Sequence, residues 1–362
     1  MDIPKYNGNI HPDEWINDIQ KFRYIWKLDY KEFLKIAISL VDPTIKLPAE
    51  ISNIEELRNA LKDNISFAVF KNTNKRKLQL LKYIPESRGG DTSKFISNFL
   101  KLCYNAEIND IEQQKNYLCE SLPMRSFFSN EFYKKMKNVN SINELIKEFE
   151  DIVVEESNLI KDESIVALKH IATGKYLSSA ENLNYTTGSC TQLVFAGSPV
   201  PDSNSLWKIK FGKELAAYNN TSIKLQHVKS SNKFLGIYYD GYNRCCYCKS
   251  PSTNHTEVSC NNLNHGYCSD NWKFNHCKLE NHQGYLKSND IINISVKKLY
   301  DNGGNYTPNG PVEFLRSHDI QFTIGNDTFQ EVVCHNERLG GNDEWCIELI
   351  KQYVWTIDVL TD

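Results

Sequence analysis

Cysteines are concentrated between Cys245 and Cys277, where their thiols could do metal or redox chemistry. Four thiolates arranged as a tetrahedron bind Zn²⁺ tightly, and the four that we consider here are Cys245, Cys248, Cys260 and Cys268. The full spacing is CC-x-C-x11-C-x7-C, which matches no standard zinc ribbon. We therefore expect buried thiols and no bound metal in this segment, with zinc coordination as the alternative.

The Cys245-x-x-Cys248 spacing also occurs in redox proteins, and it needs a particular setting there. A thioredoxin-like motif requires a βαβ unit and a helix amino terminus that lowers the thiol pKa. Other signatures, G-x-G-x-x-G, the phosphate loop, H-E-x-x-H and G-x-S-x-G, do not occur in the chain. We expect no catalytic residue, no cofactor and no enzymatic activity, while catalytic groups scattered along the sequence are the alternative.

Two histidines belong to an internal repeat. The segment ALKHIATGKYLSS at 167–179 returns as KLQHVKSSNKFLG at 224–236, and each copy closes with a tryptophan before an alternating pair. A weaker third copy, VEFLRSH at 312–318, has a closing tryptophan as well. The repeat positions are His170, Tyr176, Trp207, His227, Phe234, Trp272, His318 and Trp345. Because His170 and His227 occupy equivalent places, we expect structural imidazoles that bond the backbone, in preference to a catalytic base.

Three copies of a four-strand unit can build a propeller or a β-trefoil. Three blades are too few to close a propeller, whereas a trefoil closes with three units. The segments VALKHIATGKYLSS and SLWKI resemble the MIR domain, which occurs in protein mannosyltransferases, in inositol trisphosphate and ryanodine receptors and in stromal-derived-factor-like proteins. This resemblance covers residues 164–350 and implies an all-β trefoil of three MIR-like repeats that binds a glycan or protein ligand.

The first part of the chain has helical periodicity. From Pro12, apolar residues recur on one helical face, and Ser52-x-x-Glu55 and Ser141-x-x-Glu144 match capping boxes that precede further helices. The Arg88-Gly89-Gly90-Asp91 turn divides the helices, so the sequence predicts two lobes. Strand-like runs replace this pattern around residues 155–164. We predict a helical domain at 1–158 and an all-β domain at 159–362.

The helical part also resembles a known family. The segments YNGNIHPDEWINDIQKF, ISNIEELRNALKDNI and LLKYIPESRGGDTSKFISNFLKLC are similar to the capsid region of Gypsy-type retrotransposon Gag proteins, the family of the neuronal protein Arc. The resemblance covers residues 6–158 and implies a bilobal helical capsid domain whose lobes associate between chains. A Gag zinc knuckle, C-x2-C-x4-H-x4-C, is absent, so we do not expect nucleic-acid binding. The alternative is an unrelated helical bundle with the same apolar stripes.

Self-association residues would lie in a hydrophobic stretch after the Ser121-Leu122-Pro123 break. The candidates are Phe127, Phe128, Phe132 and Tyr133, because exposed aromatic patches mark interfaces. We therefore expect a homo-oligomer in which a self-associating capsid-like domain carries a MIR-type binding module. The alternative is a monomeric adaptor, whose trefoil recognises glycan or peptide ligands and whose helices dock a partner.

Composition sets further limits. The net charge is −3 from 42 basic and 45 acidic residues, which does not favour nucleic-acid partners. Neither a basic and apolar leader nor a run of about 18 apolar residues occurs, so we expect a cytoplasmic protein without a membrane anchor. An odd number of cysteines, 11, fits reduced thiols in that compartment.

Overall fold

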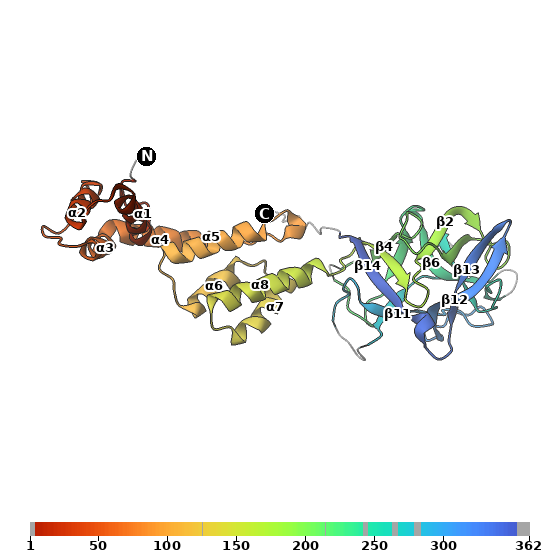
Figure 1. The fold of residues 1–362 in the computed structure, drawn as a ribbon. Helices are drawn as coiled ribbons and strands as arrows, with labels where there is room; N and C mark the ends of the chain where they lie inside the picture. The colour runs from red at the N-terminus through yellow and green to blue at the C-terminus, as the bar shows by residue number, and fades with distance from the viewer. Residues whose placement is uncertain are drawn as a thin grey trace. The chain divides into compact units, whose positions relative to one another are not determined.

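A computed structural model of the chain describes residues 4–124, 126–213, 215–241, 245–262, 267–278 and 284–352. The chain divides into two compact units, Met1–Glu156 and Ser157–Asp362. In the described residues, the first unit carries eight α-helices and the second a large antiparallel β-structure (Figure 1). No described helix combines the length and apolar character that crossing a bilayer requires.

The helical unit has two hydrophobic cores. Trp15 and Leu57 belong to the first core, and Phe99 and Phe149 to the second. The helices are α1 (Pro12–Trp26), α2 (Tyr30–Ser39), α3 (Ile54–Asp63), α4 (Ile65–Leu80), α5 (Thr92–Asn105), α6 (Ile111–Ser121), α7 (Phe127–Lys135) and α8 (Ile142–Ser157). The first three helices build the first core, and the second core is built mainly by α5 to α8.

Helix caps explain where two of these elements begin. In α1, Pro12 takes the first turn and the His11 ring accepts a hydrogen bond from the Asp13 N–H group. The expected capping box at Ser52 is displaced by one residue, because Asn53 is the N-cap and its side chain accepts from the Glu56 N–H group. Asparagine caps a helix as well as serine does, so both residues fit the sequence pattern.

Within the β unit, three sets of four main strands follow one another along the chain, and each set is a four-stranded unit. The first four-stranded unit contains β1 (Ile165–His170), β2 (Leu177–Asn184), β3 (Gln192–Ala196) and β4 (Trp207–Lys210). The second contains β5 (Lys224–His227), β6 (Lys233–Asp240), β8 (Thr256–Asn262) and β10 (Trp272–His276), with the short β7 (Cys246–Tyr247) and β9 (Cys268–Ser269) between them. The third contains β11 (Ile291–Lys297), β12 (Val312–Ile324), β13 (Asp327–His335) and β14 (Trp345–Lys351).

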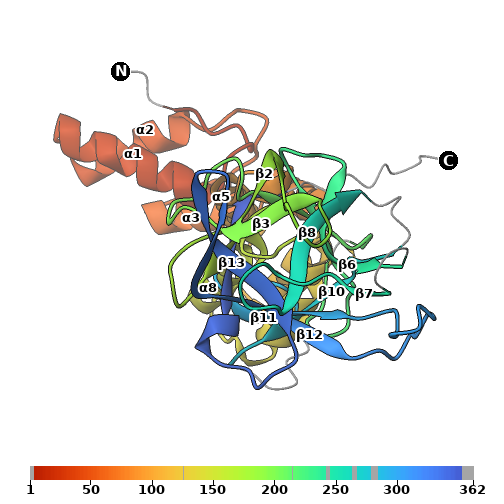
Figure 2. The same cartoon turned by 90° about the vertical axis from the view of Figure 1, so that its right-hand side faces the viewer.

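Strand pairing follows the same rule in all three units. The second and third strands form a hairpin, β2 with β3, β6 with β8 and β12 with β13. The fourth strand pairs with the first strand of the next unit, β4 with β5, β10 with β11 and β14 with β1. The third strands β3, β8 and β13 all pair with one another (Figure 2). The last unit therefore returns to the first, and one continuous core lies inside.

Candidate functional site

Three tryptophans make the same contact, one in each four-stranded unit. All three side chains are buried at the start of a fourth strand. The indole N–H group donates to the Leu177 carbonyl from Trp207 (2.9 Å), to the Leu235 carbonyl from Trp272 (2.8 Å) and to the Leu315 carbonyl from Trp345 (3.1 Å). These contacts bridge the fourth strand and the second strand of a unit. They also fix which residues are equivalent in the three units.

The second-strand leucines align the neighbouring aromatic residues. Tyr176 and Phe234 each precede one of these leucines, and both are buried. The Tyr176 hydroxyl donates to the Glu348 carboxylate over 2.7 Å. In the third unit the equivalent residue is Phe314, which the sequence pattern missed because the Gly-Lys-Tyr-Leu turn is absent there.

Two of the three tryptophans lie opposite a histidine in the strand ladder. Trp207 pairs with His227 and Trp345 pairs with His170, with ring centroids 5.1 Å and 4.9 Å apart. Burial lowers the pKa of both imidazoles, and the carbonyl that each ring bonds opposes that shift only in part. Both rings lie in the interior, and burial favours their neutral form.

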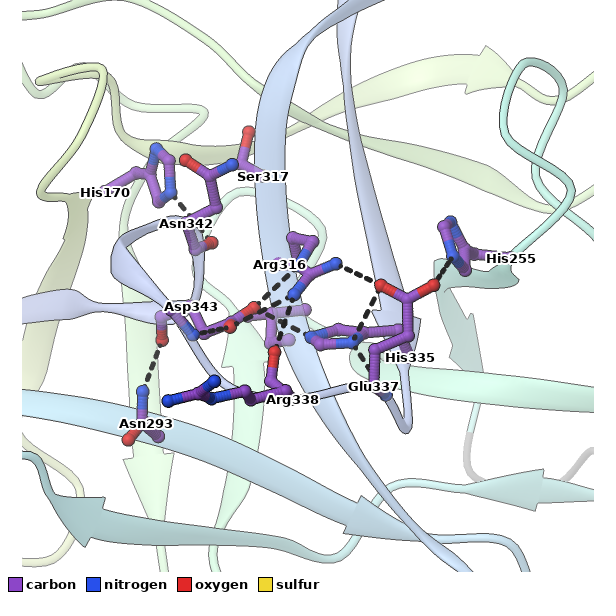
Figure 3. Close-up of polar contacts among 12 residues, drawn as sticks. His170, His255, Asn293, Arg316, Ser317, His335, Glu337, Arg338, Asn342 and Asp343 are labelled. Carbon is purple, nitrogen blue, oxygen red and sulfur yellow. Dashed lines mark hydrogen bonds and ion pairs between the residues drawn. The ribbon is translucent and has the colours of Figure 1, made fainter.

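Each of these imidazoles is held by two groups. His170 Nε2 donates to the Asn342 carbonyl over 3.0 Å (Figure 3). Its Nδ1 accepts from the Thr173 hydroxyl over 2.9 Å. The second imidazole, His227, is 3.1 Å from the Asn204 carbonyl and accepts from the Ser230 N–H group over 3.1 Å. Neither ring has a free nitrogen for proton transfer, because each nitrogen is used within the fold.

The third unit departs from this pattern. Val296 lies opposite Trp272, so a valine occupies the place of the histidine. The sequence alignment that placed His318 there is wrong, since His318 lies in the second strand, β12, and contacts Glu331 over 3.2 Å. The Leu-x-x-His pattern of VEFLRSH imitates the first strand, but only the strand pairing fixes the register.

A pocket of about 170 Å³ lies beside Val296. Its walls combine hydroxyl and amide side chains (Ser222, Ser269, Asn271, Ser295), two lysines (Lys273, Lys297) and an aliphatic surface (Val296, Leu299, Val312). Hydroxyl and amide groups can bond a polar ligand, while the aliphatic surface can cover an apolar face of it. At about 30 Å³ per water in the liquid, the volume corresponds to roughly six waters, which is room for part of a sugar ring or a group of similar size.

A second cluster of polar residues surrounds Asp343 (Figure 3). Arg316 Nε and His335 Nε2 both bond Asp343 Oδ1, at 2.8 Å and 2.7 Å, and the Gly340 N–H group donates to Oδ2. Burial raises the pKa of the Asp343 carboxyl, but these hydrogen bonds outweigh it and lower the pKa to about 2. Glu337, at the exposed side, accepts from Arg316 over 2.7 Å.

This cluster holds a loop in place. Asp343 and His335 are both fully buried, so neither is accessible to a substrate. The Asn293 side chain donates to the Asp343 carbonyl over 2.8 Å, and the preceding Asn342 supplies the carbonyl that bonds His170. The charged residues therefore position a loop, and their contacts give no indication of an acid–base pair in catalysis.

The four zinc candidates do not form a metal site in the described residues. Cys248 and Cys260 are buried, Cys268 is partly buried and Cys245 is exposed. Burial raises the pKa of the Cys260 and Cys268 thiols to about 12, which disfavours the thiolate that zinc needs. Among the described residues, no three histidine, cysteine, aspartate or glutamate side chains are grouped so that they could hold a metal ion.

Two of the four self-association candidates are core residues. Phe128 and Phe132 are 0% and 1% exposed and pack in the second helical core, so their assignment to a surface patch is wrong. Only Tyr133 is largely exposed, at 63%, while Phe127 is partly buried. The helix α7 turns two of its aromatic residues inward because the small C-terminal lobe needs them as core.

No protein-family model matches the chain, and no sequence among the curated proteins is significantly similar to it. Several solved structures are similar to it. An SDF2-like protein from Arabidopsis thaliana is 25% identical with a TM-score of 0.40, over 52% of this chain and 94% of that chain. The S. cerevisiae protein O-mannosyltransferase Pmt1-Pmt2 complex bound to the sugar donor is 16% identical with a TM-score of 0.40, over 78% and 40%. A ricin B-like lectin from Macrolepiota procera, in complex with lactose, is 11% identical with a TM-score of 0.29, over 52% and 98%.

These likenesses are too loose to assign a function. Nothing in them supports the resemblance of residues 6–158 to a Gag capsid. For the β unit, the three equivalent tryptophan contacts and the mutual pairing of β3, β8 and β13 are the firmer basis for describing the architecture.

Proposed function

We propose that the protein is a non-enzymatic binding protein whose β unit is a MIR-type β-trefoil that recognises a carbohydrate. The observation that carries the proposal is the pocket beside Val296. Sugars present hydroxyl groups around a ring whose C–H face is apolar. A pocket with serine and asparagine side chains on one part of its wall and valine and leucine on another suits both properties.

The absence of catalysis is part of this proposal. The buried Asp343–His335 pair supports it, because both side chains are bonded within the loop that they hold. The imidazoles of His170 and His227, which occupy equivalent positions, support it too. All four of their ring nitrogens form hydrogen bonds to groups within the β unit. A binding module of this kind needs neither a general base nor a nucleophile.

Self-association of the helical unit remains a prediction beside this proposal, as does a cytoplasmic location. The end of α1 exposes Tyr24 at 78% and Ile25 at 62%, and apolar exposure of this kind favours a protein contact. The alternative function is a monomeric adaptor whose β unit recognises a glycan or a peptide and whose helices dock a partner. Carbohydrate binding by the β unit does not depend on which of these describes the helices.

The test is binding of the purified full-length chain to an array of neutral and acidic glycans. We expect binding to a subset of glycans that share a terminal sugar, with competition by the free monosaccharide at millimolar concentration, as weak single-sugar contacts imply. Absence of binding to every glycan, together with capture of extended peptides, would replace the proposal by the adaptor alternative.

A further inference from the structure

Val296, on the wall of the pocket, occupies the ladder position at which the other two units hold an imidazole. His170 and His227 lie there against Trp345 and Trp207. Valine is shorter than histidine and has no ring or hydrogen-bonding atom, so at this position the third unit presents an apolar side chain to the pocket.

A second residue of the pocket wall also has an equivalent in each other unit. Asn204 and Asn342 each come three residues before a closing tryptophan, and each supplies the carbonyl that accepts from an imidazole. Ser269 comes three residues before Trp272 and lines the pocket. This position therefore contributes a serine to the polar part of the wall.

A further wall residue follows the same alignment. Thr173 and Ser230 come three residues after their histidines and bond Nδ1, Thr173 through its hydroxyl and Ser230 through its backbone N–H group. Leu299 comes three residues after Val296 and lines the pocket. Its aliphatic side chain adds to the apolar part of the wall.

The charge of the pocket is positive. Lys273 and Lys297 line it, and within the described residues neither has an ion pair. The carboxylates of neighbouring strands are already paired, Asp270 with Lys224 at 2.9 Å and Glu313 with Lys298 at 2.6 Å. No aspartate or glutamate is among the residues that line the pocket. An anionic group would therefore meet two ammonium groups without a competing carboxylate.

We propose that this pocket binds an acidic sugar, with the ring against Val296 and Leu299 and the anionic group between Lys273 and Lys297. This inference rests on the proposed carbohydrate binding and deepens it by naming the position and the charge of the sugar. The anionic group is a carboxylate in a uronic acid or a phosphate in a sugar phosphate, and both fit the two ammonium groups.

The experiment uses calorimetric titration of the full-length chain with glucuronate, glucose 6-phosphate and glucose. Both acidic sugars are expected to bind at least tenfold more tightly than glucose, and their order identifies the preferred anion. Val296→His places a bulkier side chain, which two other units accommodate at the equivalent ladder position, on the wall of the pocket and should abolish binding. Lys273→Met with Lys297→Met should weaken acidic sugars about tenfold and leave glucose unchanged.

The matched control is Lys213→Met, which removes an exposed lysine from another part of the β unit and should leave the affinity for all three sugars unchanged.

In the unsubstituted chain, the methyl NMR signals of Val296 and Leu299 should move during the titration, a readout that does not depend on whether a variant folds. Acidic sugars that bind without moving these signals would overturn the pocket assignment while leaving carbohydrate binding intact. Equal affinity for glucose and the acidic sugars would overturn the charge assignment, and a failure of all sugars here and on the array would overturn the proposed function itself.

Discussion

Val296 lies opposite Trp272 in the β10–β11 ladder, at the position where a histidine lies opposite the equivalent tryptophan of each other unit. Val296 also lines a pocket of about 170 Å³. The approximate threefold repetition closes the fold through equal contacts, and one exception to it lies on the wall of a candidate binding site.

The three equivalent tryptophans should contribute similarly to stability. Trp207→Phe, Trp272→Phe and Trp345→Phe each remove an indole N–H group and leave a buried leucine carbonyl without its donor. We expect each to lower the free energy of unfolding of the β unit by about 2–4 kcal/mol, measured by denaturant titration.

The control for this series is Trp26→Phe, since Trp26 is 46% exposed at the end of α1 and should cost less than about 0.5 kcal/mol. If one of the three core tryptophans tolerated the change as easily as Trp26 does, its unit would not share the common contact.

Acidification should destabilise the β unit through its two internal histidines. Burial lowers the pKa of His170 and His227 below the ordinary value of 6.5, so the unfolded chain takes up protons that the folded chain refuses. The stability that they contribute is complete above about pH 6.5 and is lost as the pH falls through the folded pKa values.

Ring titration by NMR and amide exchange of β1 and β5 measure both halves of this prediction. We expect midpoints below 6.5 for both rings and faster exchange at pH 5.5 than at pH 7 after correction for intrinsic rates. A ring midpoint above 6.5 would reverse the predicted sign and contradict the buried neutral imidazole.

The cluster around Asp343 should be a structural element of the β unit. Asp343→Asn removes the buried anionic partner of Arg316 and leaves it only the exposed Glu337, which should cost about 3 kcal/mol, as broken buried pairs do. Because the pKa of Asp343 is lowered to about 2, its contribution holds above about pH 4 and is lost only as the pH falls towards 2.

Glu337→Gln is the matched control, since Glu337 contacts the same arginine from an exposed position, and this substitution should destabilise the β unit far less than Asp343→Asn does. Asp343→Asn should also shift the His170 ring signals, because the adjacent Asn342 carbonyl is the acceptor of that ring. Unchanged His170 signals would separate the cluster from the loop that it is inferred to hold.

Phe128 and Tyr133 distinguish core from surface in α7. Phe128→Asp places a carboxylate in the second helical core and should unfold that lobe, whereas Tyr133→Asp should leave the melting temperature within a few degrees. Circular dichroism measures stability, and sedimentation of the same proteins tests self-association. A folded Phe128→Asp protein would contradict the core assignment, and a folded monomer at all concentrations would end the oligomer prediction.

Sequence periodicity predicted those helices and strands that depend only on residues near in sequence. Pro12 and the spacing of Trp15 and Ile16 predicted α1, and the recurring tryptophans marked the fourth strands. The third repeat could not be aligned from the sequence, because strand register depends on partners that are distant in sequence. A short pattern such as Leu-x-x-His fits the first strand of a unit as well as the second. The exception at Val296 escaped prediction for the same reason, since a valine at a histidine position is visible only after the register is known.

The most direct test of carbohydrate binding at this site is a crystal structure of the full-length chain grown with glucuronate. The account predicts a sugar between Ser269 and Leu299, with its carboxylate within about 3 Å of the ammonium groups of Lys273 and Lys297. Sugar bound elsewhere on the β unit while the Val296 pocket holds only water, at a ligand concentration that saturates the chain in solution, would contradict it.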